Sequence, residues 1–358
     1  MRICYFGAFD LSYTRNSYVR RCLELNNCSI FFCNVPQHWP TYKKVLPLIV
    51  QFCRFRNSCD IIIVAEFCQT VVPLAWLLGK ITGKLIVFDM VIGLYEASVL
   101  ERCRYPENSI SAKKLHLIDQ MAIWFSDLVI TGTEAYRNYL IDEFHGATEK
   151  IQVVPLGVDD SLFFPKTRNK INDKFVVLYH GSFIPNHGLN IIVKCASLLN
   201  EDKRFIFRFV GDGEQKEYVQ LLSNKMKLNN IEFVSKVPFK ELPKHLVDAD
   251  IVLGVFGDTS QARKAMANKI LEGLAMKKTV VSGDTDSIRE NFVHKQHIWL
   301  VPLGDAKSLS KALCGLVENH ELMENLAESG YNRVKQRLTP RVVGANLVVA
   351  LENAYTIS

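Results

Sequence analysis

Short apolar runs alternate with longer segments of helical periodicity along nearly the whole chain. The apolar runs in the first half, which are typical of buried strands, are residues 2–6, 29–35, 60–65, 84–89, 127–131 and 151–155. The segments with apolar residues at helical spacing are residues 18–25, 42–56, 71–82, 113–125 and 133–144. Because continuous apolar strands that alternate with helices are typical of parallel sheets, this half predicts a doubly wound α/β domain.

The same alternation restarts near residue 175 and ends with two long helical segments that are separated at Pro340. A chain of 358 residues is also too long for one comfortable hydrophobic core. We therefore expect a first domain over residues 1–165, a linker over 166–174 and a second domain over 175–339. The last helix, residues 340–358, would be free to pack back on the first domain.

Composition narrows the class of protein. With 48% hydrophobic and 22% charged residues, the chain is neither disordered nor fibrous. The ten cysteines form no CxxC pair, which favours buried free thiols over a disulfide framework or a zinc site. The net charge of +6 comes entirely from residues 166–358, without the dense basic and aromatic face of a nucleic-acid binder. This surplus suits a phosphorylated small ligand.

The sequence leaves the question of membrane contact open. No segment has the ~18 uncharged apolar residues that a membrane span requires, and the N-terminus reads as a strand rather than a signal peptide. We therefore expect a cytoplasmic protein. Residues 42–56 are apolar with basic ends, which fits peripheral attachment at the inner face of a membrane and equally fits an ordinary helix packed on its sheet.

Residues 251–290 combine a strand, a basic loop and a helix. The apolar strand 251–256 leads into a loop with Arg263 and Lys264, and Lys269 stands at the start of the following helix. A helix N-terminus among cations at the carboxyl edge of a parallel sheet suits a phosphate. Glu272, one turn further, could accept hydrogen bonds from ribose hydroxyls. The alternative is an ordinary βαβ unit whose basic side chains are solvated.

Several segments together resemble the retaining glycosyltransferases of family 4, which have the GT-B fold. The segments that carry the resemblance are SDLVITGTEAYRNYL, KIQVVPLGVDDSLFFP, VLYHGSFIPNHGLNIIV, RFVGDGEQ, IEFVSKVP, ADIVLGVFGD and NKILEGLAMKKTVVSGDTDSIRE. They occur in the family's order and cover residues 125–337, whereas the upstream half fits only loosely. The resemblance implies two Rossmann-like domains that face each other across a cleft. It also implies a nucleotide-sugar donor in the second domain, an acceptor in the first, and no metal or other cofactor.

The family's phosphate and sugar motifs are only partly kept. The second glutamate of its Glu-x7-Glu motif falls on Glu272, but the first falls on Lys264. The family's Gly-Arg-Leu-(x)3-Lys-Gly pattern falls on a stretch in which Gly181 is kept while Ser182 and His187 replace the two cations.

Other cations must then stabilise the diphosphate leaving group. Arg263, Lys264 and Lys269 are the nearest candidates, and Asn268 and Lys269 followed by Glu272 resemble a sub-group with Asn-Lys-x-x-Glu at this place. The resemblance thus assigns catalytic roles to Lys269 and Glu272.

The remaining candidates have plain structural alternatives such as a tight turn, a strand end or a surface cation. The further donor-binding candidates are Gly211, Lys236, Ile270 and Glu290. Gly7 and Arg15 are the acceptor-binding candidates, and Arg15 could hold a phosphate of a lipid-linked acceptor. Asp89 is the catalytic candidate at a strand end where the family often uses a histidine, since no histidine lies between His38 and His116.

The sequence thus predicts a metal-independent, retaining glycosyltransferase. It would move a hexose or amino-hexose from a nucleotide diphosphate sugar to a saccharide or lipid-linked acceptor in polysaccharide or glycolipid assembly. A GT-B epimerase is one alternative, since it would alter the sugar without an acceptor. A phosphorylase is less favoured because no cofactor lysine site is visible. A non-catalytic nucleotide-sugar-binding protein is the other alternative, because the motifs have lost two cations and a carboxylate.

Overall fold

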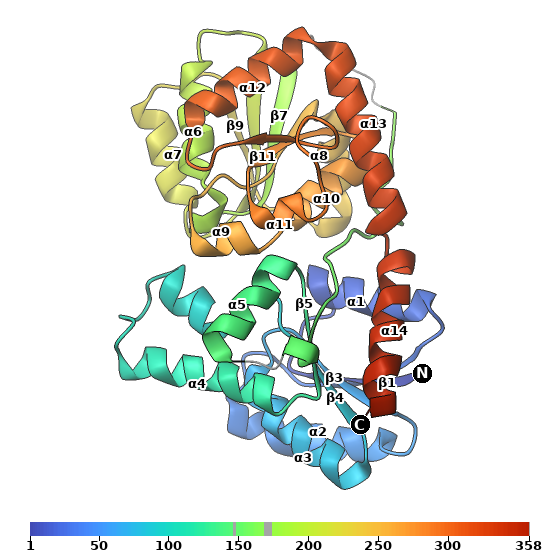
Figure 1. Cartoon of the computed structure of the whole chain (residues 1–358). Helices are drawn as coiled ribbons and strands as arrows, with labels where there is room; N and C mark the ends of the chain where they lie inside the picture. Colours follow the sequence, from blue (N-terminus) through green and yellow to red (C-terminus); the bar gives the residue numbers. More distant parts are fainter. Residues whose placement is uncertain (146–147, 168–173, 358) are drawn as a thin grey trace. The chain divides into compact units, whose positions relative to one another are not determined.

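A computed structural model describes residues 1–145, 148–167 and 174–357. The chain forms two compact units: one comprises Met1–Leu156 with Pro340–Ser358, and the other Gly157–Thr339. The boundary therefore follows Leu156 rather than Pro165, and most of the predicted linker lies outside the described residues. Each unit contains one parallel sheet of six strands flanked by helices, which confirms the predicted doubly wound α/β class (Figure 1).

The first unit has the strand order β2-β1-β3-β4-β5-β6. Its strands are β1 (Arg2–Gly7), β2 (Ser29–Asn34), β3 (Ile61–Val64), β4 (Leu85–Asp89), β5 (Leu128–Thr131) and β6 (Ile151–Val153). Its longer helices are α1 (Thr14–Leu25), α2 (Thr41–Phe55), α3 (Val72–Thr82), α4 (Ile110–Trp124), α5 (Glu134–Phe144) and α14 (Pro340–Ile357). Every residue of β3 and β4 is buried, as expected of strands covered on both faces.

Right-handed crossovers place α2 to α5 on one face of this sheet and α1 on the other. The terminal helix α14 lies against α1, where the side-chain amide of Asn26 donates to the Arg341 carbonyl at 3.2 Å. The strand order reverses between β1 and β3, so the carboxyl ends of these two strands mark the place where a ligand is expected in this unit.

The second unit has the strand order β12-β11-β10-β7-β8-β9. Its strands are β7 (Phe175–Ser182), β8 (Phe205–Asp212), β9 (Ile231–Val234), β10 (Ile251–Leu253), β11 (Thr279–Gly283) and β12 (Trp299–Val301). Its helices are α6 (Leu189–Leu198), α7 (Lys216–Lys225), α8 (Leu242–Asp248), α9 (Ser260–Lys264), α10 (Asn268–Ala275), α11 (Asp286–Arg289), α12 (Ala306–Glu318) and α13 (His320–Arg337). The strand order reverses between β7 and β10.

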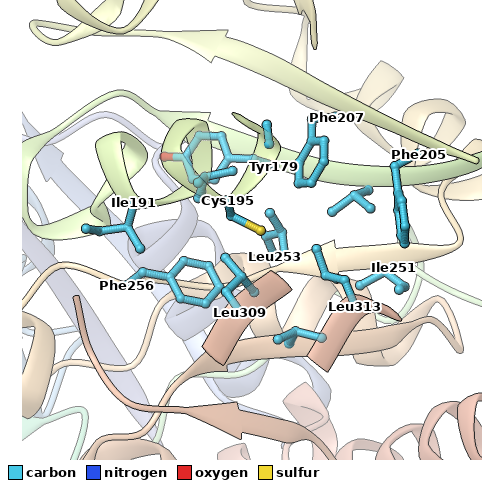
Figure 2. Packing of buried hydrophobic residues seen from close by; sticks show 14 of the residues in the cluster. Tyr179, Ile191, Cys195, Phe205, Phe207, Ile251, Leu253, Phe256, Leu309 and Leu313 are labelled. Atoms are coloured by element: carbon cyan, nitrogen blue, oxygen red, sulfur yellow. The ribbon is translucent and has the colours of Figure 1, made fainter. Parts of the chain in front are cut away.

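A large apolar core holds the second unit together. Figure 2 shows Phe205 and Phe207 of β8, Leu253 of β10, and Leu309 and Leu313 of α12 in this core. Each of these five side chains is at most 1% exposed. This rigid core fixes the carboxyl ends of β7 and β10, where the candidate site lies.

The structure corrects several predicted elements. The irregular stretch 90–111 contains a π-helix, Glu96–Leu100. The loop predicted after β10 contains α9, and β10 itself ends at Leu253 instead of Phe256. The predicted helix 306–337 is two helices, because the side chain of Asn319 accepts from the Leu322 N–H and thereby caps α13.

No helix in the described part of the chain is long and apolar enough to cross a membrane. The same residues contain no group of three or more histidine, cysteine, aspartate or glutamate side chains that could hold a metal ion.

Candidate functional site

The candidate site lies at the carboxyl ends of β7 and β10, at the switch point of the second sheet. The loop after β7 is held against the loop after β10, because the Phe256 N–H donates to the His187 carbonyl at 3.1 Å. Gly188 makes this approach possible: its φ is +65°, and a Cβ there would lie 2.4 Å from the Gly257 nitrogen. The backbone of the His187 loop is thus fixed in place.

Lys269, in the first turn of α10, is buried and contacts residues of β7 and its loop. Its Nζ lies 3.1 Å from Tyr179 Oη, 3.0 Å from His187 Nδ1 and 4.1 Å from the centre of the Tyr179 ring. Among the described residues, no carboxylate lies within ion-pair distance of this Nζ. Lys269 is therefore a buried amine held by uncharged polar groups and by an aromatic face, which would favour its protonated form.

Lys269, Tyr179, His187 and the Ser182 carbonyl form one hydrogen-bonded cluster. Burial, followed by the charge of Lys269, lowers the pKa of His187 well below its usual value, which keeps the imidazole neutral. The Tyr179 hydroxyl donates to the Ser182 carbonyl at 2.6 Å and accepts from Lys269. His187 Nδ1 also lies 2.7 Å from the Ser182 carbonyl oxygen and 2.7 Å from the Tyr179 hydroxyl, so it either donates to that carbonyl or accepts from Lys269, depending on the tautomer. Nε2 makes no hydrogen bond within the part of the chain that the structure describes; it is an acceptor in the first tautomer and a donor in the second.

Glu272 lies one turn along α10 and is also buried. Its Oε2 is 3.5 Å from Nδ1 of His180, a buried residue of β7. Burial raises the pKa of Glu272 to about 7, although Lys269 opposes the shift, and burial lowers the pKa of His180 to about 3. Burial likewise lowers the pKa of Lys269. The site thus holds ionisable groups whose charged forms are disfavoured, and a charged or hydroxylated ligand would change that balance.

Several predicted donor residues surround this centre. Gly181 faces Lys269, since a Cβ at Gly181 would lie 3.5 Å from Lys269 Cε. Gly211 pairs with Gly181 across β7 and β8. The side-chain oxygen of Asn268 is buried without a hydrogen-bond partner in the described residues, and Ile270 is wholly buried.

The other predicted donor residues lie in more exposed positions. Arg263 forms an ion pair with Asp258 at 2.5 Å, and both side chains are more than half exposed. Lys264 ends α9 and Glu290 follows α11, and both are partly exposed. Lys236 is exposed just beyond β9. Arg263 therefore already has a carboxylate partner, and Lys269 is the cation that contacts the His187 loop.

In the first unit, the structure brings Arg15 and Asp89 together, although the sequence suggested separate roles for them. Arg15 donates to the Asp89 carboxylate through Nε at 2.9 Å and Nη2 at 2.9 Å, and through Nη1 to the Val154 carbonyl at 3.2 Å. Both side chains are at most 2% exposed. Each therefore neutralises the other inside the unit, and neither has a free charged end.

Glu66 beside this pair was missed by the sequence interpretation. It follows β3, is 2% exposed, and its Oε2 has no hydrogen-bond partner among the described residues. Burial and the charge of Asp89 raise the pKa of Glu66 to about 8, while Arg15 opposes the shift. Gly7, at the end of β1, lies close to the same loop, since a Cβ there would be 2.7 Å from Cys68 Sγ. The sequence feature that could have indicated Glu66 is its position, a carboxyl group directly after an apolar strand.

Comparisons of the sequence find similarity to glycosyltransferases. The family model described as Glycosyl transferases group 1 matches residues 161–333. The capsular polysaccharide biosynthesis glycosyltransferase CapM of Staphylococcus aureus is 20% identical over 247 residues, which are 65% of this chain and 63% of CapM. The amylovoran biosynthesis glycosyltransferase AmsK of Erwinia amylovora is 23% identical over 211 residues, 57% of this chain and 51% of AmsK. The matches thus span between about half and just under two thirds of these relatives.

Comparisons of the structure extend over the whole chain. HepE from Anabaena, solved in complex with UDP, has a TM-score of 0.75 at 15% identity, with 99% of this chain and 100% of HepE covered. Sucrose-phosphate synthase from Thermosynechococcus elongatus has a TM-score of 0.79 at 14% identity, with both chains fully covered. At such identities the likeness shows the fold, which is the predicted GT-B fold. The sequence of residues 161–333 is therefore similar to the glycosyl transferases group 1 family, and the chain as a whole has the GT-B fold.

Proposed function

We propose that the protein is a retaining glycosyltransferase that moves a hexose or amino-hexose from a nucleotide diphosphate sugar to a saccharide or lipid-linked acceptor. Polysaccharide or glycolipid assembly is the process that fits best, since CapM and AmsK are both named for polysaccharide biosynthesis. The observation that carries the proposal is Lys269, a buried lysine without a carboxylate ion-pair partner in the described residues, at the switch point of the second sheet.

The donor would bind with its diphosphate at Lys269 and His187. A diphosphate supplies the negative charge that would stabilise the protonated lysine, and His187 in the tautomer with its proton on Nε2 would donate to a phosphate oxygen. Glu272 would accept from ribose hydroxyls, with His180 holding its carboxylate. HepE was solved with UDP, which supports a nucleoside diphosphate as the ligand class.

Leaving-group stabilisation would then be the chemical task of this site. As the glycosidic bond breaks, negative charge grows on the departing diphosphate, and a preorganised cation lowers that barrier by several kcal/mol. Lys269 would serve this role without a metal ion. The departing phosphate oxygen would take the proton of the attacking hydroxyl on the same face of the sugar, which gives retention of configuration.

The acceptor would bind to the first unit, close to the switch point between β1 and β3. Asp89 and Arg15 would act there by fixing each other, and Glu66 would offer a carboxyl group that is protonated at neutral pH. A protonated carboxyl can donate to one acceptor hydroxyl oxygen and accept from another. Gly7 would contribute by letting the end of β1 approach the Cys68 loop beside this group.

Assays of donor binding and of sugar transfer test the proposal. The protein is screened by thermal shift against UDP, GDP and ADP and their sugar conjugates, and the best donor is then used for transfer assays with mild-acid-released glycolipid or oligosaccharide acceptors. Lys269→Met should lower turnover at least tenfold. The matched variant Lys264→Met applies the same substitution to the lysine at the end of α9.

Three results would contradict the proposal in different ways. Donor binding without transfer or hydrolysis would favour a non-catalytic nucleotide-sugar-binding protein. Release of an altered sugar without any acceptor would favour an epimerase. Unchanged turnover in Lys269→Met would remove Lys269 from the chemistry.

A further inference from the structure

The outer surface of helices α2 and α3 carries exposed large apolar side chains. On α2, Tyr42 is 75%, Leu46 68% and Val50 46% exposed. On α3, Leu77 is 49% and Ile81 73% exposed. Residues four apart lie on the same side of a helix, so each helix presents one apolar stripe to its surroundings. We call these five residues the α2–α3 face.

This face is not needed for the hydrophobic core. Helix α2 packs on its sheet through Leu48 and Phe52, which are at most 1% exposed, and α3 packs through Val72 and Ala75, which are wholly buried. Both helices cover the same side of the first sheet, the side away from α1 (Figure 1). The two apolar stripes therefore point outward from one layer of the fold.

Cations frame the apolar stripes, and neither helix contains an aspartate or a glutamate. Lys43 and Arg54 are exposed on α2, Arg56 follows it directly, and Lys80 is exposed on α3. Lys80 lies 3.9 Å from Asp127, a long contact in which the lysine is 60% exposed. Lys43, Arg54 and Arg56 have no ion pair with any residue that the structure describes. The face is therefore apolar in the middle and positively charged at its edges.

We propose that the α2–α3 face docks on a membrane surface that contains anionic lipids. Exposed apolar side chains can enter the boundary between headgroups and acyl chains, and the flanking cations are attracted to negative headgroups. A second copy of the chain fits less well, because two such faces would bring cations together and neither helix contains a carboxylate to pair with them. The inference concerns the first unit alone and does not depend on the proposed reaction.

Vesicle sedimentation tests this surface with a matched control. The full chain is spun with vesicles of phosphatidylcholine alone, or of phosphatidylcholine mixed with phosphatidylglycerol, at low and high salt. We expect the mixed vesicles to bring the protein down at low salt, and high salt to weaken the binding. Leu46→Asn and Ile81→Asn should each weaken binding several-fold. Leu221→Asn on α7 should bind like the wild type, although Leu221 is 68% exposed, as Leu46 is.

A charge variant separates the two contributions to binding. Lys43→Gln with Arg54→Gln should lower binding to the mixed vesicles about fivefold for each cation removed. Circular dichroism of each variant checks that the fold is kept. Absence of sedimentation at low salt, or an equal loss in Leu221→Asn, would overturn the proposal. A third result would also overturn it: the protein does not bind vesicles but forms a concentration-dependent dimer, and Leu46→Asn abolishes that dimer. The α2–α3 face would then bind a second copy of the chain.

Discussion

Glu66→Gln should make the first unit more stable, and the gain should grow with pH. Glutamine has nearly the same shape as the protonated glutamate but cannot ionise. The groups that face Glu66 are the buried pair Asp89 and Arg15, and Tyr5, Tyr13 and Cys68 are also close enough to interact with it electrostatically. The difference in unfolding free energy between the variant and the wild type therefore reports the cost of keeping Glu66 protonated in the folded protein.

The size of the effect follows from the two pKa values of Glu66. The pKa is about 8 in the folded protein, whereas it is about 4.3 in an unfolded chain. Between these values the folded state binds more protons than the unfolded state, so the free energy of unfolding falls as pH rises. At about 1.4 kcal/mol per pH unit, the wild type should lose roughly 3 kcal/mol relative to the variant between about pH 4.5 and pH 7.

Urea unfolding followed by tryptophan fluorescence measures this difference. Trp39, Trp76 and Trp124 lie in the first unit and Trp299 in the second, so the signal reports mainly on the unit that contains Glu66. Glu217→Gln changes an exposed glutamate on α7 and serves as the control, with no pH-dependent gain expected. A difference between Glu66→Gln and the wild type that stays constant across this pH range would refute the reasoning, because it would mean that Glu66 ionises in the folded protein as it does in the unfolded chain.

Further predictions concern the second unit. Tyr179→Phe removes the hydroxyl that accepts from Lys269 and donates to the Ser182 carbonyl; urea unfolding should show a loss of about 1 kcal/mol or more, and a variant as stable as the wild type would contradict these bonds. Gly188→Ala places a Cβ 2.4 Å from the Gly257 nitrogen at a φ of +65°, so its thermal midpoint should fall clearly, while Gly315→Ala, with open space around it, should not lower it. Lys269→Met should be more stable than the wild type at neutral pH by a margin that shrinks as pH rises towards 10, because the folded pKa of the lysine lies below its unfolded value; a margin that does not change would contradict the lowered pKa.

The sequence predicted the architecture well because its signals are local. Continuous apolar runs such as residues 60–65 and 84–89 became β3 and β4, which are buried on both faces. The short elements escaped because they depend on tertiary contacts. Strand β12 has three residues and pairs only with β11. Helix α9 is a single turn that is capped by Thr259.

The site was predicted only in part, because some of its residues have local sequence signals and others depend on tertiary contacts. Lys269 and Glu272 stood out because helix periodicity put them at the start of α10. Their partners Tyr179 and His180 lie about ninety residues earlier, in what reads as an ordinary buried strand, so pairing them required the fold. The pairing of Arg15 with Asp89 was hidden in the same way, since two charges that are distant in sequence give no sign that they neutralise each other. Glu66 was overlooked because one carboxyl after a strand has no motif.

Calorimetric titration with a nucleoside diphosphate tests the central claim, that Lys269 is the buried cation of an anion-binding site. The tightest binder among UDP, GDP and ADP is titrated at neutral pH into the wild type, Lys269→Met and the matched variant Lys264→Met. The account predicts at least a tenfold rise in Kd for Lys269→Met, and a wild-type affinity that falls as pH rises through the lowered pKa of Lys269. Equal affinity of the wild type and Lys269→Met, at every pH, would contradict it.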